Sequence, residues 1–96
     1  MIALPAALTM GQARQVLAGL ELALRQSDQP QIDASALVSL DSAAIAVLLQ
    51  CRRIAQAAGK SLLIANPPPK LTELARLYGV DALLAREAER QSHAPA

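Results

Sequence analysis

Residues 37–49, LVSLDSAAIAVLL, place one charged residue in the middle of a mostly apolar run. A strand-like segment ends near Asp41, and apolar residues then recur at helical spacing, which predicts a helix over residues 42–58. We expect Ser42 to be the N-cap, whose side-chain oxygen accepts a hydrogen bond from a free backbone N–H in the first turn. The charge of Asp41 would complement the positive end of the helix dipole. This junction therefore indicates where a strand gives way to a helix.

The same spacing predicts two more helices, over residues 11–26 and 70–78, each with its apolar residues on one side. Residues 32–38 are predicted to form a buried strand followed by an irregular turn. The short apolar run at residues 61–65 lies between turn signals and follows a helix, which predicts a buried parallel strand. Pro5 limits the first ten residues to a short edge strand or to two very short strands. The order helix, strand, helix, strand, helix predicts an α/β fold with right-handed crossovers.

The length of 96 residues fits one domain, which we assign to residues 1–96. Apolar residues make up 53% of the chain, and Tyr78 is the one aromatic residue. Short aliphatic side chains suit a tightly layered packing of helices on a sheet. Residues 91–96 are expected to be disordered.

The chain lacks the residue patterns of common active sites. Cys51 is the single cysteine, on the core-facing side of a predicted helix, where a free thiol behaves as a small hydrophobe. The single histidine, His93, lies in the tail, and no glycine motif for phosphate binding is present. Asp33 and Asp41 have no accompanying base or metal-binding residue in the sequence pattern. We expect a protein that is not an enzyme and that binds no metal or cofactor.

The charge pattern limits the classes of partner. The formal net charge is +1 and the basic residues are scattered, so nucleic acid is not an expected partner. The longest unbroken apolar run, residues 43–49, is far shorter than the roughly 20 residues that span a bilayer. The first residues lack the positive charge of a secretory signal. We expect a cytoplasmic protein without direct membrane insertion.

A helical wheel over residues 42–58 gives one broad apolar face that can cover a sheet. Ile45 and Leu49 fall outside that face, among polar residues, and they line up with Ser42. Aliphatic side chains that stand in water and are rimmed by arginines are typical of a docking surface. The alternative is that another part of the chain, such as residues 80–90, covers them. The expected docking residues are Asp41, Ser42, Ile45, Ala46, Leu49 and Arg53.

Residues 32–37, IDASAL, and residues 40–49, LDSAAIAVLL, resemble the signature of STAS domains, the sulfate-transporter and anti-sigma-factor-antagonist modules. That signature has a strand ending in Asp-hydrophobic-Ser, a short apolar turn, and then Asp-Ser or Asp-Thr opening a helix. Ala44 departs from it, because the family often has glycine there. The similarity continues through Gly59-Lys60, Asn66-Pro67 and the stretch LARLYGV at residues 74–80.

Within the family, the chain is most similar to the small subunit of the bacterial ABC system that moves phospholipids between the outer and inner membranes, the Mla pathway. The resemblance covers about residues 8–85, the expected core of the domain. It implies a STAS-like α/β fold: a short mixed β-sheet of about four strands with a reduced N-terminal edge, and helices mainly on one face. It also implies a non-catalytic accessory protein. Such a protein binds the ATPase subunit of the transporter, through the helix that starts at Asp41 and Ser42, and supports its assembly and activity. The alternative is an anti-sigma factor antagonist. In that case Ser42 matches the serine that is phosphorylated by an anti-sigma factor kinase.

Overall fold

The computed structural model describes residues 2–80, so the predicted features at residues 80–90 and 91–96 lie almost wholly outside the described residues. The described part contains three helices: α1 (Ala13–Gln26), α2 (Ser42–Ala57) and α3 (Pro69–Leu77). It also contains five short strands: β1 (Ile2–Ala3), β2 (Ala7–Leu8), β3 (Gln31–Asp33), β4 (Ser39–Leu40) and β5 (Leu63–Ala65).

All three predicted helices are confirmed, and each observed end lies within two residues of its predicted position. Gly59 and Gly79 follow the ends of α2 and α3, with φ angles of 74° and 71°. This left-handed conformation ends a helix and costs glycine no steric energy. Pro69 begins α3, where its missing N–H leaves no helical hydrogen bond unmade.

The main sheet has three strands in the order β1-β3-β5, and both pairings are parallel. Ile32 lies opposite Ile2 on one side and opposite Ile64 on the other. A second parallel pair joins β2 to β4. The expectation of a mixed sheet is therefore wrong for residues 2–80. Each neighbouring strand is reached through a helix, and such a crossover returns the chain in the same direction.

The N-terminal edge is reduced, as expected, but in a specific way. β1 and β2 do not pair with each other; β1 runs along β3, and β2 runs along β4. The residues between β1 and β2 include Pro5, which has no N–H to donate. On either side of Pro5, the Leu4 N–H donates to the Asp33 carbonyl at 3.0 Å and the Ala6 carbonyl accepts from Ser39 N–H at 2.9 Å.

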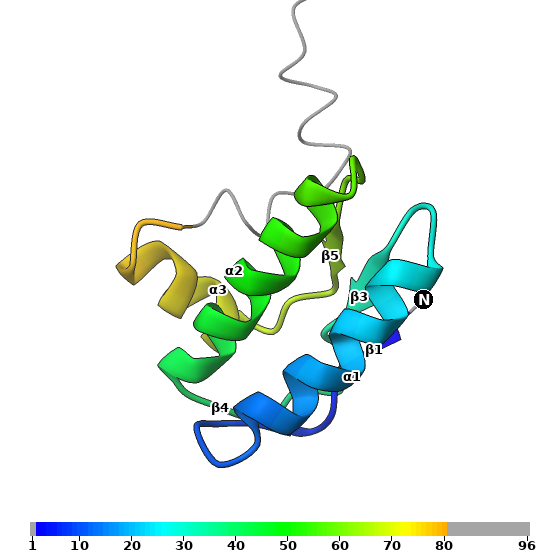
Figure 1. The fold of residues 1–96 in the computed structure, drawn as a ribbon. Coiled ribbons are helices and arrows are strands. Elements are labelled where there is room, and N and C mark those ends of the chain that lie inside the picture. The colour runs from blue at the N-terminus through cyan, green and yellow to red at the C-terminus, as the bar shows by residue number, and fades with distance from the viewer. Residues whose placement is uncertain (1, 81–96) are drawn as a thin grey trace, which may run out of the picture.

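One core lies between the sheet and the helices. Helices α1 and α2 lie side by side over one face of the sheet, and α3 packs against α2 (Figure 1). Ile32 of β3, Leu48 of α2 and Leu71 of α3 are fully buried in the same cluster. The neighbours of Ile32 along β3, Gln31 and Asp33, are only half-buried, which follows the alternation of a strand. Contact with both α1 and α3 makes the buried side of α2 wide.

Candidate functional site

Helix α2 begins at the carboxylate of Asp41. Asp41 Oδ1 accepts a hydrogen bond from the backbone N–H of Ala43 at 2.8 Å, so Asp41 is the N-cap. The prediction of Ser42 as the N-cap is wrong by one residue, because Asp41 is extended and its side chain reaches the free N–H first. Asp41 Oδ2 also accepts from the backbone N–H of Met10, at 3.3 Å. Asp41 therefore connects the loop before α1 to the start of α2.

The outer side of α2 carries most of the expected docking residues. Ser42, Ala46 and Arg53 are exposed, and Leu49 is half-buried against the core. Ile45 is only 4% exposed, so the prediction that it stands in water is wrong. The helical wheel assumed that α2 is buried on one side only, whereas both α1 and α3 contact it, so more of its surface is buried than predicted. We define the α2 face as Asp41, Ser42, Ala46, Leu49 and Arg53.

Two apolar side chains beside the start of α2 were not found by sequence analysis. Met10 is 77% exposed and Val38 is 74% exposed. Met10 is held near the helix start by the hydrogen bond to Asp41, and Val38 precedes Asp41 by three residues. Both lie in irregular segments, where helical periodicity gives no signal. Val38 could have been identified from its position three residues before Asp41, but Met10 is brought to the junction only by the fold.

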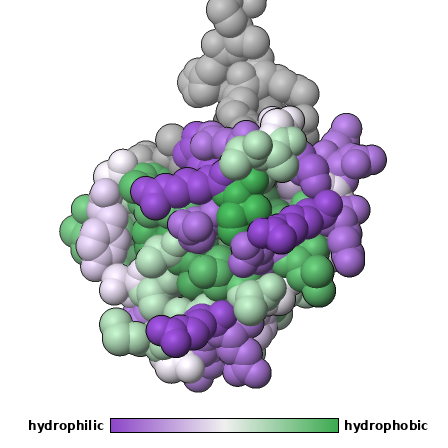
Figure 2. All heavy atoms as spheres, viewed as in Figure 1, coloured by the Kyte–Doolittle hydropathy of each residue, from purple (hydrophilic) through white to green (hydrophobic). Residues whose placement is uncertain are grey.

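A shallow apolar groove of about 370 Å³ lies between the first turns of α1 and α2. Figure 2 shows apolar surface in this region of the molecule with hydrophilic side chains on both sides of it. Its apolar lining consists of Ala13 and Leu17 from α1 and of Ala43, Ala46 and Val47 from α2. Because Ala46 belongs to both, the groove is continuous with the α2 face.

The buried thiol of Cys51 is not a candidate nucleophile. Burial, with a smaller contribution from the negative charge of Glu21, raises the pKa of Cys51 to about 11. At neutral pH the thiol is therefore protonated, whereas the thiolate is the reactive form. Its full burial confirms the prediction of a small hydrophobic core residue.

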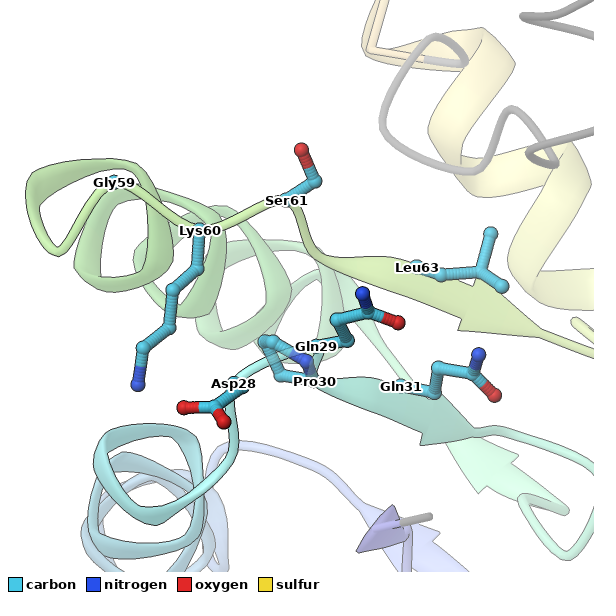
Figure 3. Close-up of a pocket in the computed structure, with 8 residues that line it drawn as sticks. All are labelled: Asp28, Gln29, Pro30, Gln31, Gly59, Lys60, Ser61 and Leu63. Atoms are coloured by element: carbon cyan, nitrogen blue, oxygen red, sulfur yellow. The ribbon is translucent and has the colours of Figure 1, made fainter.

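A polar pocket of about 340 Å³ lies at the end of the sheet where β3 and β5 begin (Figure 3). Lys60 extends from the segment after α2 toward the end of α1. Its ammonium donates to the carbonyls of Leu24 and Arg25, at 2.9 and 3.2 Å. These are carbonyls of the last helical turn, which a cation stabilises. Lys60 therefore joins α1 to the segment that leads into β5.

Residues 2–80 contain no group of three or more His, Cys, Asp or Glu side chains placed to hold a metal ion. In the same residues, no helix is both long enough and apolar enough to cross a membrane. The carboxylate of Asp33 is occupied by local contacts, since Oδ1 accepts from the Ser35 N–H at 3.0 Å and from the Asn66 amide at 3.2 Å. The α2 face and the adjoining groove are the surface features that contain the predicted docking residues.

A family model described as "Mlab, STAS domain" matches residues 1–85. The chain belongs to the STAS domain family. Two solved structures are similar to it. The anti-sigma factor antagonist SpoIIAA in its unphosphorylated form has a TM-score of 0.68 and 20% identity, over 94% of this chain and 80% of that one. An anti-sigma-factor antagonist (STAS) domain protein from Planctomyces limnophilus has a TM-score of 0.71 and 18% identity, over 88% and 77% of the two chains. No match was found among curated proteins.

The residues that carry the STAS resemblance have distinct positions in the fold. Asp33 ends β3, Asp41 caps α2, and Gly59 follows α2. Ser42 is the first residue of α2 and is exposed to solvent. Ser42 is therefore an accessible residue at the N-terminus of a helix in this STAS domain.

Proposed function

We propose that this STAS domain is a non-catalytic accessory subunit that binds the ATPase subunit of a bacterial ABC transporter of the Mla type, in the cytoplasm. Membership of the Mlab family supports a partner from that phospholipid-transport system. The observation that carries the proposal is the accessible surface at the start of α2, where Ser42 and Ala46 are exposed and the exposed Met10 is joined to Asp41 by a hydrogen bond. Contiguous exposed apolar surface with a polar rim is characteristic of protein interfaces.

A second candidate function uses the same face with another partner. The exposed hydroxyl of Ser42 supports the role of an anti-sigma factor antagonist that a kinase phosphorylates. A phosphate adds about −1.5 to −2 charges, which the N-terminus of α2 stabilises within this domain. The same charge weakens a complex in which an apolar partner surface removes Ser42 from water. Phosphorylation would then dissociate the complex without unfolding the domain.

The test is a titration of the purified domain against two purified proteins from the same genome, the Mla-type ATPase and an anti-sigma factor kinase. We expect binding to the ATPase, and we expect Ser42→Asp and Ala46→Asp each to lower that affinity by about tenfold or more, which is about 1.4 kcal/mol. Leu22→Asp is the control, because Leu22 is an exposed aliphatic residue of α1 outside the α2 face.

Each outcome decides between the candidates. Binding to the kinase alone, with phosphate transferred to Ser42, would replace the transporter role by the anti-sigma role. Binding of Ala46→Asp to the ATPase at wild-type affinity would place the docking surface elsewhere. Circular dichroism melting of each variant separates lost binding from lost folding.

A further inference from the structure

The groove between α1 and α2 lies where both helices begin. Ala13 and Arg14 are the first two residues of α1, and Ala43 is the second residue of α2, so the first turns of both helices line it. The alanine side chains are short, which leaves a hollow between the two helices. Its volume of about 370 Å³ has room for an apolar side chain from a partner.

Arg14, on the rim of this groove, has no ion-pair partner among the described residues. Arg14 is exposed in the first turn of α1, where a cation opposes the helix dipole. Neither α1 nor α2 has an acidic residue in its first turn. Among residues 2–80 the one ion pair joins Arg25 to Glu21, so Arg14 has no carboxylate partner there.

The backbone N–H groups at the start of α1 add to this positive potential. The N-cap residue Gln12 makes no side-chain hydrogen bond to the helix, and its side-chain oxygen accepts from the Thr9 N–H at 3.1 Å instead. Asp41 is the acidic residue at the start of α2, and both of its oxygens accept backbone hydrogen bonds, from Ala43 and Met10. A carboxylate brought by another molecule would therefore be stabilised beside Arg14.

We infer that the groove receives an apolar anchor from a segment of the partner that also carries an acidic residue, and that this residue pairs with Arg14. This inference rests on the proposed function and specifies the chemistry of the partner, the transporter ATPase. The apolar anchor supplies buried area, and the ion pair supplies orientation and a faster encounter. The interface would then extend from the α2 face onto α1.

Arg14→Glu tests the charge, and Lys70→Glu is its matched control. Lys70 is also exposed and is also the second residue of its helix, α3, so both substitutions reverse the charge at the same helical position. We expect Arg14→Glu to lower the affinity for the purified ATPase by about tenfold, and Lys70→Glu to change it by less than about threefold. A glutamate is favoured in a first helical turn, so neither melting temperature should fall.

Ala13→Leu tests the hollow itself, because the larger side chain fills the groove from α1 without changing the α2 face. We expect this variant to bind the ATPase more weakly than the wild type. Its affinity should change with salt concentration as the affinity of the wild type does. Arg14→Glu should instead lose part of that dependence, since salt screens the ion pair that it removes.

The outcomes separate this inference from the function on which it rests. If the wild type binds the ATPase, Ala46→Asp weakens binding, and Arg14→Glu behaves as Lys70→Glu does, the groove inference is wrong and the proposed function stands. If the wild type does not bind the ATPase, both are wrong. If light scattering finds a dimer of this chain that Arg14→Glu dissociates, the occupant is a second copy and the inferred partner is wrong.

Discussion

The side-chain amide of Asn66 donates to Oδ1 of Asp33 at 3.2 Å and so joins the residue after β5 to the last residue of β3. Asn66 adopts a left-handed backbone with φ of 54°, a conformation that asparagine tolerates better than most residues. The Ser35 N–H donates to the same oxygen at 3.0 Å. These hydrogen bonds stabilise the ionised carboxylate. The Ser35 backbone N–H is the main cause, followed by Asn66, and together they lower the pKa of Asp33 below its ordinary value.

The lowered pKa predicts an acid-dependent loss of stability. The contribution of Asp33 is present in full above the pKa of an unfolded aspartate, about 3.9, and is lost as the pH falls through the lower folded-state value. We expect the melting temperature of the wild type to fall more steeply with decreasing pH in this range than that of Asp33→Asn. Melting curves at a series of pH values measure this. The control is Asp28→Asn, at an exposed aspartate; equal slopes for wild type and Asp33→Asn would contradict the prediction.

Adjacent residues of α2 should respond oppositely to substitution. Ile45 is 4% exposed, so Ile45→Ala leaves a cavity and should lower the free energy of unfolding by about 2–5 kcal/mol. Ala46 is exposed, and Ala46→Ser should change the free energy of unfolding by about 0.5 kcal/mol or less. Leu49→Asp should also destabilise, because Leu49 is packed against the core. Urea unfolding measures the effect of all three substitutions. An Ile45→Ala variant as stable as the wild type would contradict the burial of Ile45.

The cap at Asp41 gives a prediction that separates stability from binding. Asp41→Ala removes the oxygen that accepts from the Ala43 N–H and should lower stability by about 0.5–2 kcal/mol. Asp41→Asn keeps an accepting oxygen and should lose less. Thermal melting measures this effect. A melting curve for Asp41→Ala like that of the wild type, together with lost binding to the ATPase, would make Asp41 a contact residue rather than a cap.

Lys60 should stabilise the domain through its ammonium group. Lys60→Met keeps the aliphatic stem but removes the hydrogen bonds to the Leu24 and Arg25 carbonyls, which should cost about 0.5–1.5 kcal/mol. Lys70→Met is the control, since Lys70 is exposed on α3. Denaturant midpoints measure the difference, and equal midpoints for the two variants would assign no stabilisation to the Lys60 contacts.

Cys51 should report unfolding through its chemistry. Because its thiol is fully buried and its pKa is raised to about 11, a disulfide reagent at neutral pH should label the native protein far more slowly than the unfolded protein. The labelling rate should increase with urea in step with unfolding. Rapid labelling of the native protein would mean that α2 opens locally.

The helices were predictable because each has an apolar side and a chemical stop signal. Gly59 and Gly79 marked two helix ends correctly, since few other residues adopt positive φ. The partners of the strands were not predictable from short apolar runs. A run of two or three residues does not specify its neighbour, and the pairing of β2 with β4 depends on how the chain passes Pro5.

The candidate site was predictable in part. The Asp41–Ser42 junction and the exposure of Ala46 and Arg53 followed from the sequence. The burial of Ile45 did not, because a helical wheel treats α2 as packed on one neighbour, whereas both α1 and α3 contact it. The groove between α1 and α2 depends on how the two helices pack, so it cannot be predicted from the residues of either helix alone.

The central position of β3 has a consequence for synthesis on the ribosome. β3 ends at Asp33, but its neighbour β5 does not begin until Leu63. While the intervening residues are being made, one edge of β3 has backbone N–H and C=O groups that a strand of another nascent chain can pair with. Chains that stop before Ala65 therefore cannot complete the three-stranded sheet. We expect these truncated chains to be the form that aggregates or requires a chaperone, while the full domain stays in solution.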